Sequence, residues 1–243
     1  INNMTFYNYE LINRSTQTLQ DTYFAQYVDP DVGGPRDDYV GCDVGRGLAF
    51  AFNGDADDQT DQGAIGYGST PPAVGVDFFE GPYQDDDGID NAEGTGDGEA
   101  LNGLGYGDGI VDNERYGMRK FLYYTNPGSN PPNYSTDPSS AADHYQYMRG
   151  FWKDGTRMVY GGTGHFTTSP YTGGSDNPAF YADFMFLGSS DTVNCGMPNR
   201  PEAATFDSWD EVTENKPPGD SRFWQSAVLF ASTPGAGHNL TVR

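Results

Sequence analysis

Basic residues are scarce in this sequence. Its 243 residues include 13 Lys and Arg against 35 Asp and Glu, which gives a formal net charge of −22. A charge of that sign repels nucleic-acid phosphates and anionic membrane surfaces, so neither is an expected partner. It suits a protein whose carboxylates are neutralised in part by bound cations, or one that works in salty water.

Long hydrophobic runs are also absent. No apolar stretch approaches the roughly 18 residues that a transmembrane helix needs, so no membrane insertion is expected. There is no signal peptide, and the chain opens on Ile1 and ends on Arg243 within strand-like runs. We therefore expect a mature or excised piece of a longer polypeptide.

The common catalytic and zinc-binding signatures are missing. The sequence contains no GxSxG, no Walker loop and no dinucleotide fingerprint that links a strand to a helix. His144, His165 and His238 are isolated, and no CxxC or HExxH pattern occurs, so zinc is not an expected cofactor. These absences favour a non-catalytic protein over an enzyme.

Cysteine is rare. Cys42 and Cys195 are far apart in sequence. A disulfide between them is predicted if the protein matures in an oxidising compartment, and two buried free thiols are the alternative.

Glycine, proline and aromatic residues are plentiful, with 33 Gly, 16 Pro and 14% Phe, Trp and Tyr. Runs rich in Tyr, Phe and Val, bounded by Gly, Pro, Asn and Asp, predict strands over 4–12, 22–28, 47–53, 73–79, 120–124, 157–161, 180–186, 222–231 and 238–242. One helix is predicted within 139–152, capped by Ser139 or Ser140. The expected fold is a single all-β domain over 1–243, an antiparallel jelly-roll-like β-sandwich with long acidic loops.

The acidic residues gather in short loops with glycine between them. Calcium takes six to eight hard oxygen ligands, which EF-hand-like loops supply at alternate positions. Three clusters suggest this chemistry, and the last two lie in a loop insertion over 80–117. The predicted Ca²⁺ ligands are Asn53, Asp55, Asp57 and Asp61; Asp85, Asp87, Asp90 and Glu93; and Asp108, Asp112 and Glu114.

These loops depart from a strict EF-hand pattern. Asp58 stands where a glycine is expected, and Tyr83 and Leu104 stand where the first aspartate is expected. A solvated acidic loop is the alternative for each cluster. A fourth acidic cluster contains Asp29, Asp31, Asp37, Asp38 and Asp43, and Arg36 is an alternative partner for one of these carboxylates.

Several long stretches resemble a known family. They include "MTFYNYELINRSTQTLQDTYFAQYVDPDVG", "DDYVGCDVGRGLAFAFNGDAD", "PPAVGVDFFEGP" and "PGDSRFWQSAVLFASTPGAGHNLTV". The sequence is similar to a region of large secreted or cell-surface proteins of Bacteroidetes-type bacteria, which carry a C-terminal sorting domain for type IX secretion. The resemblance implies export and a multidomain parent, but no reaction. It also implies O-glycosylation at Asp-Ser/Thr followed by a small apolar residue, which Thr192 fits.

The expected function follows from these features. We expect a calcium-stabilised extracellular module with a structural or adhesive role, in which loop aromatics contact a glycan; the candidates are Trp209, Tyr171 and Tyr134. One alternative is a polysaccharide-active enzyme using Asp210 or Glu211 beside Trp209, or Asp154 beside Trp152. "FWKDGTRM" more simply predicts a hairpin turn. Another alternative is a subunit of a surface filament or layer, whose terminal strands complete a neighbour's sheet.

Overall fold

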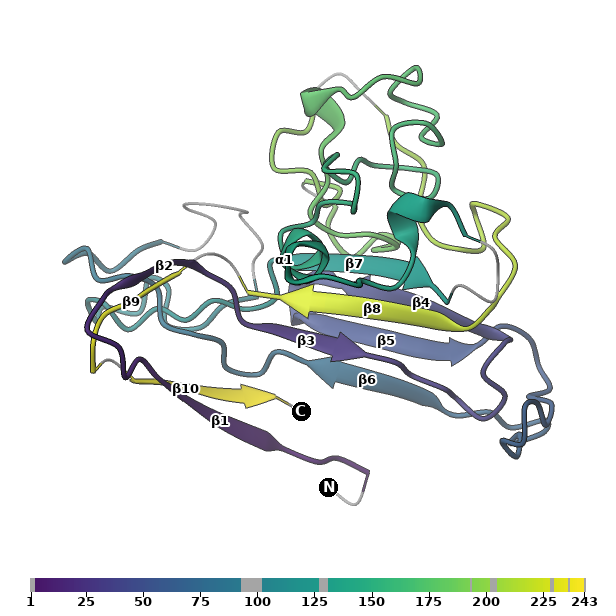
Figure 1. Ribbon diagram of the computed structural model, residues 1–243, viewed down its shortest axis with the longest axis horizontal. Helices are drawn as coiled ribbons and strands as arrows, with labels where there is room; N and C mark the ends of the chain where they lie inside the picture. The colour runs from purple at the N-terminus through teal and green to yellow at the C-terminus, as the bar shows by residue number, and fades with distance from the viewer. Residues whose placement is uncertain are drawn as a thin grey trace.

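Two three-stranded antiparallel sheets form the body of the molecule (Figure 1). The computed structural model describes residues 3–92, 102–126, 131–192, 194–201, 205–227, 230–235 and 237–242. The two sheets are the layers of an antiparallel β-sandwich, so the predicted all-β fold is confirmed. Among the described residues there is one α-helix, and no helix is long and apolar enough to cross a membrane.

The first sheet has the order β4–β5–β6, with β4 spanning Asp38–Asp43, β5 Leu48–Asn53 and β6 Ala73–Asp77. A short 3₁₀ turn, η1 (Val44–Arg46), joins β4 to β5, and Gly47 ends it at a φ of 65°. The side chains of β5 alternate as expected for a strand. The face of β5 that carries the small alanine side chains is the buried one, because Ala49 and Ala51 are 0% exposed whereas Phe52 is 36% exposed.

The second sheet has the order β3–β8–β7, with β3 spanning Ala25–Val28, β8 Ser221–Ser226 and β7 Lys120–Thr125. Phe121 and Phe223, from its two longer strands, are buried with ring centroids 5.2 Å apart. These rings lie in the hydrophobic core with Ala49 and Ala51 of the first sheet. Large rings on one layer against small residues on the other fill a core without voids.

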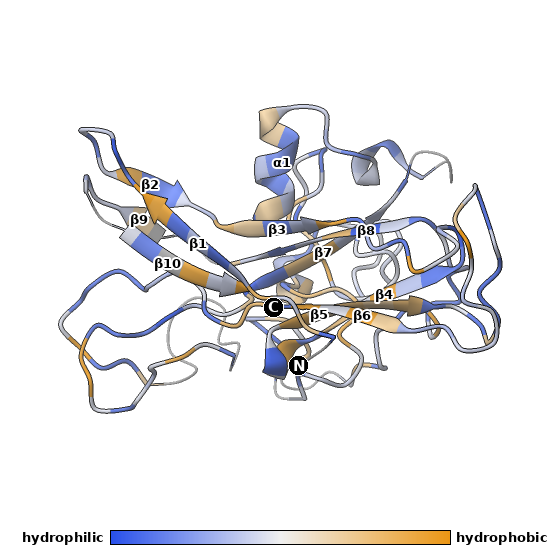
Figure 2. Cartoon of the chain, turned by 90° about the horizontal axis from the view of Figure 1, so that it is seen from below, coloured by the Kyte–Doolittle hydropathy of each residue, from blue (hydrophilic) through white to orange (hydrophobic). Residues whose placement is uncertain are grey.

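Two further strand pairs extend away from the sandwich (Figure 2). In one pair, β1 (Tyr7–Ile12) is antiparallel to β10 (Gly237–Val242), and in the other β2 (Leu19–Thr22) is antiparallel to β9 (Phe230–Ser232). Residues near the two ends of the chain therefore lie side by side. β1 is almost entirely exposed, so its stability comes mainly from its pairing with β10.

An irregular lobe, made of the described residues of 149–220, lies above β7 (green in Figure 1). Strands were predicted there over 157–161 and 180–186, and this prediction is wrong: the described residues pair only through isolated bridges, such as Val159 with Tyr181. Both runs are almost completely buried, so their apolar character reflects burial. Gly161 and Phe186, the last residue of each run, have positive φ angles, so the backbone leaves the extended conformation there.

The helix α1 (Ala141–Met148) begins at Ser140, as predicted. The Ser140 hydroxyl accepts the Asp143 N–H, and the Asp143 carboxylate accepts the Ser140 N–H, which is a capping box. Tyr147 is the buried residue of the helix and packs against Tyr124 of β7 with ring centroids 5.2 Å apart. Two short 3₁₀ turns, η3 (Asn133–Ser135) and η4 (Pro178–Phe180), lie in the loops.

Candidate cation-binding site

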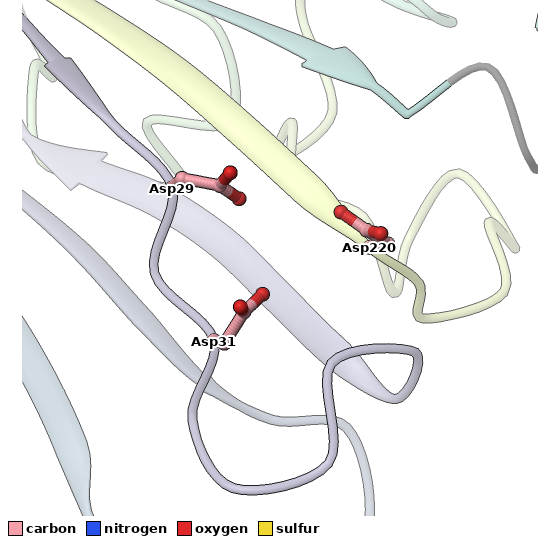
Figure 3. A group of neighbouring side chains, drawn as sticks. All are labelled: Asp29, Asp31 and Asp220. Atoms are coloured by element: carbon pink, nitrogen blue, oxygen red, sulfur yellow. The ribbon is translucent and has the colours of Figure 1, made fainter. Parts of the chain in front are cut away.

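Three aspartates meet where β3 ends and β8 begins (Figure 3). Asp29 and Asp31 follow β3, and Asp220 immediately precedes β8. Because β3 and β8 are antiparallel, with Val28 opposite Phe223, the end of one strand lies beside the start of the other. One carboxylate oxygen from each aspartate lies within 4.8 Å of the other two. We call this set the aspartate trio.

A single arginine contacts the trio. The Arg222 guanidinium lies 2.8 Å from Asp29, 3.2 Å from Asp137 and 3.7 Å from Asp220. Asp31 makes the fourth carboxylate of the group, so four negative charges face one positive charge and three remain uncompensated. Burial raises the pKa of Asp31, and the nearby charges of Asp29 and Asp220 raise it further. Burial also raises the pKa of Asp220, although Arg222 opposes this.

The donor set of the trio suits a hard divalent cation. All three groups are carboxylates, and no sulfur or imidazole is among them. Hard oxygen ligands favour Ca²⁺ or Mg²⁺ over zinc. Within the described chain, this is the one group of three or more His, Cys, Asp or Glu side chains with such spacing. The sequence pointed to Asp29 and Asp31 but missed Asp220, which stands directly before a strand in "PPGDSRFW".

The two predicted calcium loops of the 80–117 segment bind each other. Asp112 accepts the backbone N–H groups of Asp87 and Gly88, both at 2.9 Å. Asp90 reciprocates by accepting the N–H groups of Gly107 at 2.8 Å and Gly109 at 2.7 Å. Each loop thus supplies one aspartate that accepts two backbone N–H groups of the other loop.

The other carboxylates of this segment also accept hydrogen bonds. Asp87 and Asp108 accept the N–H two residues later, each at 2.9 Å, and Asp85 accepts the Ala231 N–H at 2.9 Å. Glu114 is buried and accepts the Asn91 N–H. Their oxygens do not form a group like the trio among the described residues. Calcium binding by these loops stays a prediction, and Glu93 lies outside the described residues.

The 53–61 cluster is arranged differently from its predicted form. The Asn53 amide donates to the Asp55 carbonyl at 3.0 Å, and Asp55 accepts the Asp57 N–H at 2.8 Å. Asp61 forms a bidentate ion pair with Arg36, which therefore does not pair within its own acidic cluster. Asp61 is thereby paired with a basic residue, and calcium binding by this cluster stays a prediction.

Two further acids of this region have structural roles. Asp58, which occupies the expected glycine position, is buried and accepts the N–H groups of Gly34 and Tyr67, each at 2.8 Å. Asp43 caps η1 and pairs with Arg46. Neither role follows from the spacing of acids alone.

The aromatic residues proposed for glycan contact pack into the protein. Trp209 is 0% exposed, and its indole N–H donates to the Gly162 carbonyl at 3.0 Å. Tyr134 stacks on His165 with ring centroids 3.9 Å apart, and Tyr171 packs on Phe206 at 5.1 Å. The prediction is wrong for Trp209, because a fully buried ring has no face for a sugar. Tyr134 and Tyr171 are half-buried and pack against the core, and glycan contact by them stays a prediction.

The acids of the alternative enzyme hypothesis also have structural partners. Glu211 is buried, accepts the Val40 N–H and lies 3.0 Å from the Lys216 ammonium. Burial raises the pKa of Glu211 to about 8 and lowers the pKa of Lys216 to about 8. Asp154 lies in the predicted turn, where the Gly155 N–H donates to the Trp152 carbonyl at 2.9 Å, and it also contacts His165 at 3.1 Å.

The two cysteines and Thr192 are the remaining predicted site residues. Cys42 and Cys195 are both free thiols, so the predicted disulfide is not formed; of the two, Cys42 is buried and Cys195 is half-buried. The Cys42 thiol is buried and donates to the Met185 carbonyl at 3.3 Å. Thr192 is exposed, as a modification site must be, and its glycosylation stays a prediction.

The structure contains an exposed aromatic groove that the sequence pattern did not predict. It has a volume of about 720 Å³ and lies between β1, the edge strand β3 and the edge strand β6. Tyr7, Tyr9 and Tyr27 line it and are 55%, 42% and 47% exposed. The tyrosine pattern in "YNYE" and "AQYV" is a signal, but it also fits ordinary half-buried strands. We call this feature the tyrosine groove.

Comparison with known proteins adds no assignment. No protein-family model matches the chain, and searches of curated proteins and of solved structures found no match either. The resemblance to type IX secreted proteins, and the extracellular location that it implies, therefore stay predictions.

Proposed function

We propose that this chain is a non-catalytic, cation-stabilised module of a secreted or cell-surface bacterial protein, with a structural or adhesive role. The observation that carries this proposal is the aspartate trio, whose carboxylate oxygens lie within 4.8 Å of one another with one arginine beside them. The extracellular setting rests on the sequence resemblance, and it supplies calcium as the abundant hard cation. Calcium is therefore the ion that we assign to the site.

A bound cation at the trio would stabilise the contact between β3 and β8. Asp29 and Asp31 belong to the segment that leaves β3, whereas Asp220 belongs to the segment that enters β8. These segments are almost 200 residues apart in sequence, since Arg222 and Asp29 are separated by 193 positions. An ion that binds only the folded form stabilises it by about 2.7 kcal/mol at a hundred times its dissociation constant.

The first test measures bound metal by mass spectrometry, together with melting curves in calcium and in chelator. We expect bound calcium in the purified protein and a higher melting temperature in calcium. Asp31→Asn should remove most of the gain at this site, because Asp31 is the trio member that makes no ion pair with Arg222 among the described contacts. This variant lowers the charge of the trio and leaves the Arg222 pairs in place.

The matched control is Asp207→Asn, which makes the same charge change at an exposed position of the irregular lobe. Sodium chloride at equal ionic strength controls for general screening of the net charge. Equal calcium-induced shifts in the wild type and Asp31→Asn would contradict a role for the trio.

We further propose that the tyrosine groove binds a neutral glycan. Exposed tyrosine rings offer flat faces on which sugar C–H groups stack, and Gln26 and Asn3 add polar groups to the lining. The net charge of −22 disfavours anionic polysaccharides. The groove therefore replaces Trp209 as the candidate for glycan contact.

Binding to an array of neutral glycans tests the groove. Tyr7→Ala should weaken retention of any bound glycan by about tenfold, since loss of an aromatic stacking contact costs roughly 0.5–1.5 kcal/mol beyond the lost contact area. Tyr67→Ala is the control, because Tyr67 is 59% exposed and lies outside the groove. If neutral glycans bind both variants as tightly as the wild type, the groove is not the binding site.

A further inference from the structure

A second acidic corner contains buried oxygens with no hydrogen-bond donor. Among the described residues, Oδ1 of Asp38 is a buried carboxylate oxygen without a hydrogen-bond partner. Both oxygens of the neighbouring Asp37 are buried as well, and the backbone N–H groups of Asp37 and Gln59 are the donors near them. The amide oxygen of Asn53 is buried and unpartnered as well. Since buried polar atoms in folded proteins almost always have partners, such a concentration at one place requires an explanation.

Asp38 and Asn53 face each other across the first sheet. Asp38 is the first residue of β4 and Asn53 is the last residue of β5, and they are direct antiparallel partners. Side chains of such a pair lie on the same face of the sheet. The two residues are 2% and 6% exposed, so both are more than nine-tenths buried.

The other polar atoms of these two side chains are already bonded. Asp38 Oδ2 accepts the Val32 N–H at 2.9 Å, and Asn53 Nδ2 donates to the Asp55 carbonyl at 3.0 Å. These bonds fix the orientation of each side chain. Each Oδ1 is consequently held in the interior of the corner rather than turned to solvent.

Asp37 and Asp58 bring two more carboxylates to the same loop. A methyl group at the Cα of Gly34 would lie 3.2 Å from Asp37 Oδ1 and 3.2 Å from Asp58 Oδ1, so both oxygens face one point. Burial raises the pKa of Asp37, and the nearby charge of Asp58 raises it further. Of the ion pairs found in the described part of the chain, none involves Asp37, Asp38 or Asp58.

We propose that Asp37, Asp38 and Asn53, with Asp58 beside them, form a second and buried binding site for a hard divalent cation, for which Ca²⁺ is the probe. The ligands would be the two oxygens of Asp37, Oδ1 of Asp38 and Oδ1 of Asn53. This set combines carboxylate and amide oxygens, which Ca²⁺ accepts in a flexible geometry. The site shares no residue with the aspartate trio and does not depend on it.

Ca²⁺ is preferred to Mg²⁺ as the probe of this corner. Ca²⁺ accepts six to eight oxygen ligands in a flexible geometry, whereas Mg²⁺ demands a near-ideal octahedron and usually keeps several waters.

Protonation is the competing explanation for the unpartnered oxygens. A protonated carboxyl can be buried without a counter-charge, and burial favours that form. The two explanations predict different behaviour when the charge of Asp38 is removed. Asp38→Asn keeps an oxygen for the Val32 N–H and replaces the unpartnered oxygen with an NH₂ group.

The experiment is calcium titration by calorimetry of the chelator-treated full chain, combined with melting curves in chelator and in calcium. We expect the wild type to show at least two calcium-binding events, one at the aspartate trio and one at this buried corner. Asp37→Asn and Asp38→Asn should each weaken one binding event by at least about tenfold, since even groups that only orient metal ligands contribute 10–100-fold to affinity. In chelator, Asp38→Asn should melt at the wild-type temperature or above, because it removes a buried uncompensated charge.

Matched variants separate this proposal from that of the aspartate trio. Asp31→Asn should abolish the other binding event and leave this one intact, and Asp207→Asn should change neither. If Asp37→Asn and Asp38→Asn both retain every binding event of the wild type within about twofold, the buried site does not exist and protonation explains the oxygens. Near-UV circular dichroism verifies folding, and Asp37→Asn decides the question if Asp38→Asn does not fold.

Discussion

At the scale of single residues, Asp183 holds the irregular lobe to the sandwich. It is 2% exposed and pairs with the Lys120 ammonium of β7 and, at 2.9 Å, with the Arg157 guanidinium of the lobe. Its backbone adds a bond in each direction: its N–H donates to the Gly196 carbonyl at 2.7 Å, and its carbonyl accepts the Phe121 N–H at 2.9 Å. One carboxylate therefore compensates two partly buried cations.

Asp183→Asn should lower the free energy of unfolding by about 3 kcal/mol, because removal of one partner leaves buried charge without compensation. The measurement is urea unfolding followed by tryptophan fluorescence, since Trp152 and Trp209 are buried in the lobe. Asp207→Asn is again the control for loss of one negative charge. A change below about 1 kcal/mol would mean that solvent already screens the two cations.

At the scale of elements, the capping box of α1 gives a prediction with a definite pH dependence. Hydrogen bonds from the Ser139 backbone, and then from the hydroxyls of Ser140 and Ser139, lower the pKa of Asp143 to about 2. A carboxylate with a depressed pKa stabilises the folded state above its ordinary pKa, and this contribution disappears as the pH falls toward about 2.

Asp143→Ala should therefore be less stable than the wild type at pH 7, and the difference should shrink as the pH falls below about 4. Asp143 is near the surface, so the loss at pH 7 should stay under about 1 kcal/mol. Urea unfolding at pH 7 and pH 3 measures it, with Asp207→Ala as the control. A difference that is the same at both pH values would show that the ionised carboxylate is not the source of the effect.

The elements also show what a sequence pattern can predict. β5, β6, β7, β10 and the start of α1 follow from local signals, namely alternation, turn residues and a serine cap. β4 was missed because "DYVGCD" is short and begins and ends with an acid, although it pairs with β5 as a local hairpin through η1. The lobe was mistaken for strands because a buried irregular segment is as apolar as a buried strand.

At the scale of the whole molecule, the net charge of −22 could be counted from the sequence but not located in space. The aspartate trio combines residues from both ends of the chain, so only the pairing of β3 with β8 assembles it. The two acidic loops over 85–91 and 107–114 were predicted separately, and their binding to each other is a property of the fold. The spacing of acids along the sequence identifies candidate ligand residues, whereas the pairing of strands decides which of these residues lie close together.

The pairing of β1 with β10 has a mechanical consequence. Tyr7 lies opposite Val242 and Ile12 lies opposite Gly237. The first residue of β1 and the last residue of β10 therefore lie at the same end of this two-stranded ribbon. A pulling force applied to both ends would load the hydrogen bonds between these strands one after another, as in opening a zip. The β1–β10 ribbon would therefore separate at low force. The sandwich, with its core and its acidic corners, would stay folded until the released segments were fully extended.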